Sequence, residues 1–210
     1  MAEEYLNKIS KKSKNEHGRN NEAGFRDRWR KQLSALLTTF VNLYSYLNPF
    51  EFTDEDVELQ FFKGNPSLGK YYNWIIVGDV VDPDWFSEAI RKEMAVYLND
   101  WQLDHLPERV DLLRKLLHSN LSLPNVIYTH CEAGTDRTGE VSGAYYMRYL
   151  NMTFEQALSI DNHVQNRSIA KMSLRGLKWY CYYLQYDKDY NVNCTVPSYI
   201  LSAGFNSIKT

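Results

Sequence analysis

Apolar and polar positions follow different patterns in the first third of the chain. Residues 1–22 are rich in Lys, Asn, Glu and Ser without apolar periodicity, and they predict a mobile tail. From residue 25 to residue 47 apolar side chains recur at helical spacing, which predicts a long amphipathic helix that ends near Pro49. Acidic and turn-forming residues over 51–70 predict a loop with a short helix. We therefore expect a helical extension over residues 23–70.

The middle of the chain alternates between apolar runs and helical patterns. The runs at 71–81 and 126–129 predict buried strands, and a further strand is expected at 94–98. Helices are predicted over residues 85–93, from 107 onward, over 139–150, from 154 onward and over 174–186. Interleaved strands and helices favour an α/β fold, in which a short central sheet is flanked by helices. We expect this core to span residues 71–188, followed by an irregular segment at 189–210.

The composition argues against several classes of function. The formal net charge is −2, so no overall positive field attracts nucleic acid, and no apolar run approaches the roughly 20 residues that span a bilayer. The polar N-terminal stretch does not resemble a secretory signal, so we expect a cytoplasmic protein. Cys181 and Cys194 could pair, but that location favours reduced thiols. Without a secretory signal, Asn-x-Ser/Thr triplets such as those at Asn120 and Asn151 are expected by chance.

The segment from Val126 to Glu140 carries the candidate chemistry. Its apolar run ends just before Cys131, and a short loop with Arg137 leads into a helical pattern. A strand, a tight loop and a helix N-terminus gather backbone N–H groups around an anion. The positive helix end and the Arg137 guanidinium would stabilise the thiolate form of Cys131, which is its nucleophilic form. The guanidinium can grip two phosphate oxygens at once and Thr138 can hydrogen-bond the sulfur, so the segment predicts phosphoryl transfer.

The pattern His-Cys-x-x-Gly-x-x-Arg-Thr-Gly over residues 130–139 resembles the phosphate loop of the cysteine-dependent protein tyrosine phosphatases. The resemblance implies that Cys131 is the nucleophile, that Arg137 binds phosphate, and that the reaction needs neither a metal nor a cofactor. His130 and Thr138 would be auxiliary residues, the first orienting the cysteine and the second easing departure of its sulfur. The phosphate-binding segment would comprise Glu132, Ala133, Gly134, Thr135, Asp136 and Arg137. A nucleotide-binding P-loop is excluded because the Gly-Lys-Ser/Thr ending is missing.

The resemblance also implies a general acid on a loop upstream of the cysteine. Asp104 is the first choice: it lies in Trp-Gln-Leu-Asp-His-Leu-Pro, which resembles the Trp-Pro-Asp-His loop of the family, although Gln-Leu replaces the proline. Asp104 lies 27 residues before Cys131, which suits the phytase-like branch. Asp100 lies 31 residues before Cys131, which suits the dual-specificity branch better. Asp136 is a third candidate, because some phosphoinositide phosphatases carry an aspartate before the loop arginine.

Similarity to the dual-specificity phosphatases continues beyond the loop. The patterns Ala-Leu-Ser-Ile at 157–160 and Gln-Asn-Arg-Ser-Ile at 165–169 resemble a helix of that family, with two extra residues between the two parts. The insertion leaves open whether Arg167 contacts phosphate. Gln165 is a candidate for positioning the attacking water. The resemblance covers roughly residues 71–184.

The sequence therefore predicts a hydrolase that cleaves phosphate monoesters through a phosphocysteine intermediate. Protein phosphotyrosine, with possible dual specificity, is the expected substrate, because Glu132 and Asp136 make the loop more acidic than those of many phosphoinositide phosphatases. Inositol phosphates or phosphoinositides are the alternative, since His-Cys-Glu-Ala-Gly also resembles the phytase-like enzymes. A pseudophosphatase that binds phosphorylated partners without turnover is a further alternative, although such proteins usually lack the cysteine or the arginine.

Overall fold

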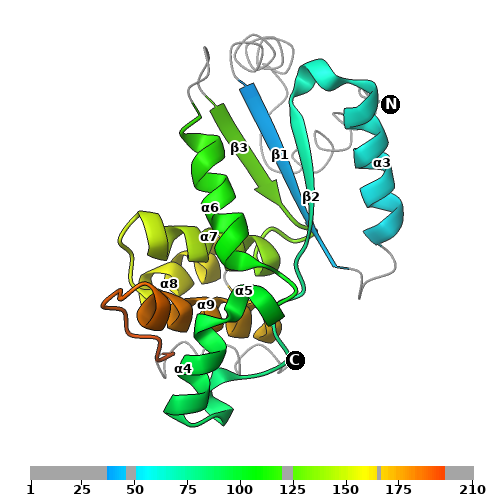
Figure 1. Cartoon of the computed structure of the whole chain (residues 1–210). Helices are drawn as coiled ribbons and strands as arrows, with labels where there is room; N and C mark the ends of the chain where they lie inside the picture. Colours follow the sequence, from blue (N-terminus) through cyan, green and yellow to red (C-terminus); the bar gives the residue numbers. More distant parts are fainter. Residues whose placement is uncertain (1–36, 46–50, 120–124, 165–166, 197–210) are drawn as a thin grey trace.

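A small parallel sheet lies at the centre of the molecule (Figure 1). The computed structural model describes residues 37–45, 51–119, 125–164 and 167–196. Its three strands are β1 (Leu37–Tyr44), β2 (Lys70–Ile75) and β3 (Asn125–His130). The strand order is β2-β1-β3, and Phe40 of β1 is level with Tyr71 of β2 and Tyr128 of β3. With the helices around it, this sheet confirms the predicted α/β class.

The central strand corrects the prediction for the N-terminal third. The helix expected over 25–47 is wrong for residues 37–44, which form β1. Side chains on both faces of β1 are buried, at Val41, Asn42 and Leu43, so the strand shows no polar–apolar alternation. A strand of this kind can match helical spacing by chance. The region expected as a helical extension thus supplies the middle strand of the sheet, while the expected tail lies outside the described residues.

The described part of the chain contains seven α-helices. They are α3 (Glu51–Gly64), α4 (Glu88–Val96), α5 (Leu98–Trp101), α6 (Leu106–Leu117), α7 (Asp136–Tyr149), α8 (Phe154–Val164) and α9 (Lys171–Asp187). Two short 3-10 turns lie at Pro66–Leu68 and Pro83–Trp85. The strand expected at 94–98 is wrong, because these residues end α4 and begin α5. Their apolar run is too short to distinguish a strand from a buried helical turn.

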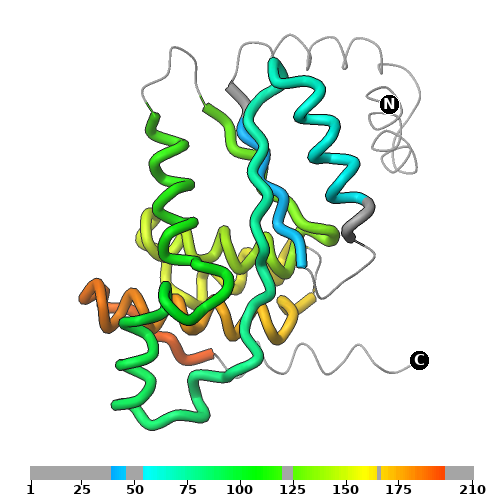
Figure 2. The backbone as a smooth tube through the Cα atoms, turned by 45° about the vertical axis from the view of Figure 1, so that its right-hand side comes forward, coloured from blue at the N-terminus to red at the C-terminus, as the bar shows by residue number. Residues whose placement is uncertain are grey.

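Helices α3 and α6 contact the sheet, and α7, α8 and α9 are called the α7–α9 group. α3 contacts β1 and β2, α6 contacts β3, and α7 packs on both α8 and α9. Figures 1 and 2 show that the carboxyl ends of the strands point toward the α7–α9 group. Phe154 of α8 and Trp179 and Tyr180 of α9 are fully buried. No helix in the described ranges is long and apolar enough to cross a membrane.

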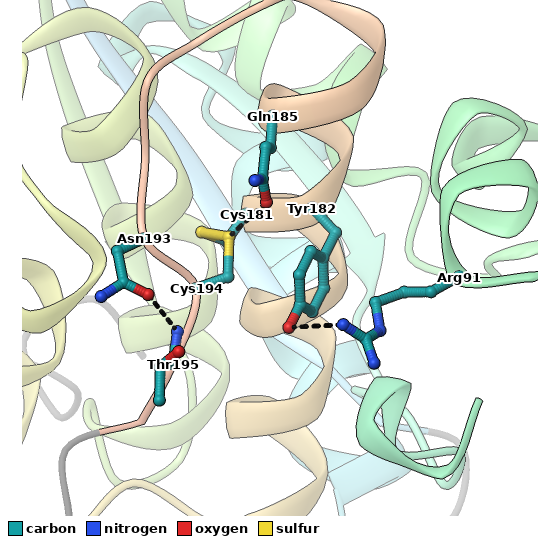
Figure 3. The surroundings of a disulfide bond; sticks show 7 residues. All are labelled: Arg91, Cys181, Tyr182, Gln185, Asn193, Cys194 and Thr195. Carbon is teal, nitrogen blue, oxygen red and sulfur yellow. Dashed lines mark hydrogen bonds between the residues drawn. A yellow bond between two sulfur atoms is a disulfide. The ribbon is translucent and has the colours of Figure 1, made fainter. Parts of the chain in front are cut away.

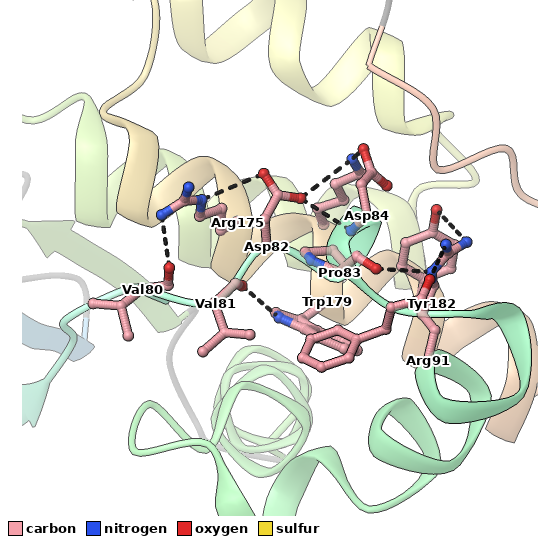
Figure 4. A network of polar contacts seen from close by, with 11 residues as sticks. Val80, Val81, Asp82, Pro83, Asp84, Arg91, Arg175, Trp179 and Tyr182 are labelled. Carbon is pink, nitrogen blue, oxygen red and sulfur yellow. Dashed lines mark hydrogen bonds and ion pairs between the residues drawn. The ribbon is translucent and has the colours of Figure 1, made fainter.

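Polar contacts with α9 hold the segment that follows β2 (Figure 4). Arg175 donates a hydrogen bond to the Val80 carbonyl at 2.7 Å and pairs with Asp82 at 3.4 Å. The indole N–H of Trp179 donates to the Val81 carbonyl at 2.9 Å. Because the chain turns toward α9 here, the strand expected in this region ends earlier than predicted, at Ile75.

A disulfide joins Cys181 of α9 to Cys194 in the segment that follows the helix (Figure 3). The expectation of reduced thiols is therefore wrong for this pair. The two cysteines lie 13 residues apart, and only the reversal of the chain after α9 brings them together. The bridge holds the segment up to residue 196, which has neither helix nor strand after α9, against the core.

Candidate active site

The cysteine loop connects β3 to α7. Cys131 directly follows the strand, and the helix begins at Asp136. Between them Gly134 has a φ of +74°, in the left-handed region that favours glycine, and the space around it is open. The Thr135 carbonyl accepts a hydrogen bond from the Gly139 N–H at 2.8 Å, which closes the first turn of the helix. The loop therefore brings Cys131 to the positive end of α7, as predicted.

The Cys131 sulfur has a hydroxyl partner. Cys131 is 9% exposed and is the free cysteine of the described chain. The Thr138 hydroxyl donates a hydrogen bond to its sulfur at 3.2 Å, whereas Glu132 and Ala133 beside it are exposed. A donor on the sulfur favours negative charge there, both when a thiolate attacks and when it leaves. The structure thus joins two of the residues that the sequence singled out.

Arg137 lies in the first turn of α7 and reaches toward the middle strand. Its Nη1 atom donates a hydrogen bond to the carbonyl of Leu43, near the carboxyl end of β1, at 2.8 Å. Because β1 lies beside β3, this bond ties the start of α7 to the strand next to the one that leads into the loop. A guanidinium has five N–H donors in a planar fork. Held in a fixed orientation, it can donate hydrogen bonds to two phosphate oxygens at once.

A second guanidinium is held at the loop by Asp136. Arg167 donates to both Asp136 carboxylate oxygens, each at 2.8 Å, and the Ala170 N–H donates to the same carboxylate at 2.6 Å. Partial burial alone would raise the pKa of Asp136, but these hydrogen bonds outweigh it and hold the pKa below its usual value. The pKa of Arg167 is raised, chiefly by the Asp136 hydrogen bond and also by the nearby Cys131. The Asp136 carboxylate therefore holds the Arg167 guanidinium beside the cysteine loop.

The side chain of His130, at the end of β3, contacts α3. Its Nε2 atom lies 3.4 Å from the Glu58 carboxylate of α3, and its ring packs at 5.4 Å from that of Tyr128. These contacts fix the residue that precedes Cys131, which is compatible with the expected orienting role.

The Asp104 carboxylate is occupied by backbone amides. Asp104 is fully buried, and its two oxygens accept hydrogen bonds from the N–H groups of Val77 and Gly78 at 2.8 and 2.7 Å. Burial raises the pKa of Asp104, and the two amide bonds oppose that rise. His105, which follows it, adopts a left-handed φ of 44° and is the N-cap residue of α6. In this state Asp104 fixes the turn after β2 to the start of α6 and has no exposed oxygen to offer a substrate.

Two further buried carboxyls lie beside Asp104. Glu140 of α7 is fully buried, and burial together with the charge of Asp104 raises its pKa well above the usual value. Gly176 of α9 faces Glu140 so closely that a Cβ atom would overlap the carboxyl oxygen. Burial likewise raises the pKa of Asp79, whose own N–H donates to the Met172 carbonyl at 2.9 Å. We call Asp79, Asp104 and Glu140 the buried carboxyl cluster.

Of the remaining sequence candidates, Asp100 lies exposed on α5, and its N–H donates to the Tyr97 carbonyl at 2.9 Å. Gln165 lies outside the described residues. Neither the position of Asp100 nor its contacts join it to the cysteine loop.

Sequence reasoning did not single out Asp161 of α8. Its side chain packs against the loop end of α7, where a Cβ atom on Gly139 would lie 2.9 Å from its carboxyl carbon. Asp161 is 2% exposed, and burial raises its pKa to about 8. It lines a cleft of about 350 Å³ together with Gly134, Thr138 and Val164. The signal in the sequence was an aspartate within an otherwise apolar helical face, but that signal does not distinguish a core residue from a site residue.

No group of three or more His, Cys, Asp or Glu side chains in the described part of the chain is arranged to hold a metal ion. Comparison of the chain with protein-family models and with curated proteins found no match. The resemblance to the tyrosine phosphatases therefore rests on the loop residues and stays a prediction.

Proposed function

We propose that this protein hydrolyses phosphate monoesters through a phosphocysteine intermediate. The observation that carries the proposal is the free Cys131 between the end of β3 and the start of α7, with its sulfur hydrogen-bonded by Thr138. The sequence pattern with Arg137 supports the same chemistry. A purely structural cysteine needs neither a hydroxyl donor on its sulfur nor a helix N-terminus beside it.

The first step is attack by the Cys131 thiolate on phosphorus. A sulfur–phosphorus bond forms, the bond from phosphorus to the leaving oxygen breaks, and the leaving oxygen takes up a proton. Arg137, the positive end of α7 and the backbone N–H groups of the loop stabilise the equatorial phosphate oxygens, because phosphoryl transfer requires mainly positioning and charge stabilisation.

The second step regenerates the enzyme. Water attacks the phosphocysteine and gives one proton to the carboxylate left by the acid of the first step. The sulfur–phosphorus bond breaks, the Cys131 thiolate is restored, and inorganic phosphate leaves. The Thr138 hydroxyl donates to the departing sulfur, which makes the thiolate a better leaving group.

The proton donor for the first step needs a protonated carboxyl near the loop. Asp104 was the first choice, but it would have to break its hydrogen bonds to Val77 and Gly78 and become exposed, so we propose a structural role for it. Asp136 has a lowered pKa and is ion-paired with Arg167, which makes it a poor acid. Among the described residues, Asp100 has no contact that joins it to the loop, whereas Asp161 packs against the loop end of α7, and its pKa of about 8 suits an acid at neutral pH.

We propose protein phosphotyrosine as the first substrate and inositol phosphates as the second. The exposed Glu132 disfavours a highly anionic substrate, whereas Arg167 beside the loop favours one. The cytoplasmic expectation is not part of the proposal, because the Cys181–Cys194 disulfide is at odds with a reducing compartment.

Phosphate release from four substrates assayed side by side tests the proposal: a phosphotyrosine peptide, a phosphothreonine peptide, a phosphoinositide and inositol hexakisphosphate. We expect turnover with the phosphotyrosine peptide, inhibition by vanadate and no effect of EDTA. Loss of activity on chelation would point to a metal enzyme. Tight binding of phosphopeptides without phosphate release would favour the pseudophosphatase alternative.

A further inference from the structure

The disulfide is the first of two observations that concern where this chain matures. Cys181 is fully buried and Cys194 is 3% exposed, so the bridge lies inside the fold (Figure 3). Disulfides that form part of a buried core persist in oxidising compartments and are rare in reducing ones. A chain that folds in the oxidising secretory compartment also meets the enzymes that glycosylate asparagine. Its Asn-x-Ser/Thr triplets then become candidate glycosylation sites.

The second observation is the position of one such triplet. Asn151, Met152 and Thr153 form the turn between α7 and α8, and Asn151 is exposed with a left-handed φ of 55°. Thr153 and Gln156 exchange hydrogen bonds at 2.9 and 3.1 Å in a capping box that starts α8. The asparagine therefore projects from a well-defined surface turn, which can carry a bulky group without disturbing the core.

The other Asn-x-Ser/Thr triplets are less suitable as glycosylation sites. Asn193 is exposed, but its side-chain oxygen accepts a hydrogen bond from the Thr195 N–H at 3.0 Å, and the cysteine between them is part of the disulfide. Asn120 and Asn166 lie outside the described residues. Asn151 thus combines the triplet, the exposure and the turn.

We propose that Asn151 carries an N-linked glycan, added while the chain matures in the oxidising secretory compartment. The Asn151 Nδ2 atom loses a proton and bonds to the anomeric carbon of a lipid-linked oligosaccharide diphosphate. The bond from that carbon to the diphosphate oxygen breaks, and the lipid diphosphate leaves. In the same compartment a disulfide oxidoreductase accepts two electrons from the thiols of Cys181 and Cys194, and two protons are released.

The glycan leaves the candidate active site open. Asn151 follows the carboxyl end of α7, whereas the cysteine loop precedes its amino end. A helix rises about 1.5 Å per residue, so the 14 residues of α7 separate the two positions by roughly 20 Å. Removing the glycan is therefore expected to leave phosphate release unchanged.

The test uses the full chain isolated from its own cells. Free thiols are alkylated before reduction, a peptide N-glycosidase is applied, and peptides are identified by mass. We expect the peptide with Asn151 to be glycosylated and to contain aspartate at 151 after the glycosidase, and we expect only Cys131 to be alkylated before reduction. An unmodified Asn151 would overturn the glycan, and alkylation of Cys181 and Cys194 before reduction would overturn the oxidising compartment.

Two variants expressed in the same cells serve as a matched pair. Asn151→Asp tolerates the left-handed turn but lacks the amide, so we expect the mass of the glycan to disappear. Thr153→Ser keeps both the triplet and the helix cap, so we expect it to keep the glycan. A glycan that persists in Asn151→Asp would contradict the assignment to this residue. None of these readouts requires phosphatase activity, so failure of this proposal and failure of the proposed function are distinguishable.

Discussion

The cysteine loop and the buried carboxyl cluster lie in the same fold and differ in what their polar groups face. In the loop, the Cys131 sulfur and the Thr138 hydroxyl are bonded to each other next to exposed residues such as Glu132. The Arg137 guanidinium is held on the Leu43 carbonyl, and that of Arg167 on Asp136. In the cluster, the Asp104 oxygens are already bonded to Val77 and Gly78, and no part of the side chain is exposed. Polar groups that face one another hold the fold together, whereas polar groups beside exposed residues can bind a ligand.

The nucleophile gives the largest expected effect. Cys131→Ser is expected to lower phosphate release to the background rate, because the serine hydroxyl does not ionise near neutral pH as a thiol does. Vanadate or phosphate should still bind, since Arg137 and the helix N-terminus remain. The matched control is Cys194→Ser, which removes a cysteine of the disulfide and should change stability rather than chemistry. Steady turnover by pure Cys131→Ser would contradict the account of the loop.

The Arg137 guanidinium comes next. Arg137→Lys keeps the charge but removes the planar fork and its bond to Leu43, so we expect kcat to fall by about 10²–10³-fold, the usual cost of one transition-state donor. Steady-state kinetics with a phosphotyrosine peptide measure this. A kcat equal to that of the wild type would show that Arg137 serves only the fold.

Asp136 should matter less, because it acts through Arg167. Asp136→Asn removes the negative partner of a bidentate pair, and a hydrogen bond to a charged group contributes about 1.5–3 kcal/mol, so we expect kcat/KM to fall by about tenfold or more. A similar loss in Arg167→Ala, and no additional loss in the double variant, would support one shared role. Additive losses would separate the two residues.

A substitution in the buried carboxyl cluster is expected to lower the free energy of unfolding. Asp104→Asn replaces one amide-accepting oxygen by an NH₂ group that faces an N–H donor, so we expect about 1–3 kcal/mol of lost unfolding free energy. Denaturant unfolding measures this loss. For the folded fraction of Asp104→Asn, we expect the same fold-reduction in kcat with a phosphotyrosine peptide and with an activated aryl phosphate. A much larger loss with the poorer leaving group would make Asp104 the general acid after all.

The remaining prediction concerns the pH dependence of stability. The pKa of Asp161 is about 8 in the fold against about 3.9 in an unfolded chain, so between these values the folded state binds the extra proton. Stability is then greatest below pH 4 for this group and falls as the pH rises toward 8, by at most about 1.4 kcal/mol per pH unit. Asp161→Asn should make the unfolding free energy less dependent on pH between 5 and 8. An unchanged slope would contradict the raised pKa.

The contrast also explains what the sequence could and could not predict. The cysteine loop is local, with a strand, a glycine turn and a helix start within 15 residues, so its backbone arrangement could be predicted in advance. The role of Asp104 depends on amides that lie 26 and 27 residues away, at Gly78 and Val77. The Asp-His motif could not show that those amides would occupy both oxygens of the Asp104 carboxylate.

The same limit applies to β1 and to the disulfide. β1 was predicted as a helix because it is buried on both faces and its neighbours are β2 and β3, which come later in the chain. The pairing of Cys181 with Cys194 depends on the reversal of the chain after α9. In each case a contact distant in sequence decides the local structure.

The most direct measurement of the central claim is detection of phosphocysteine. Enzyme and p-nitrophenyl phosphate are mixed, quenched within one turnover, digested and analysed by mass, for the wild type and for Thr138→Ala. In the proposed mechanism the Thr138 hydroxyl helps the sulfur leave. We therefore predict phosphate on Cys131, with a larger amount in Thr138→Ala and a burst of nitrophenol before slow steady turnover. Phosphate on another residue, or turnover with no phosphorylated Cys131 in either protein, would contradict the account.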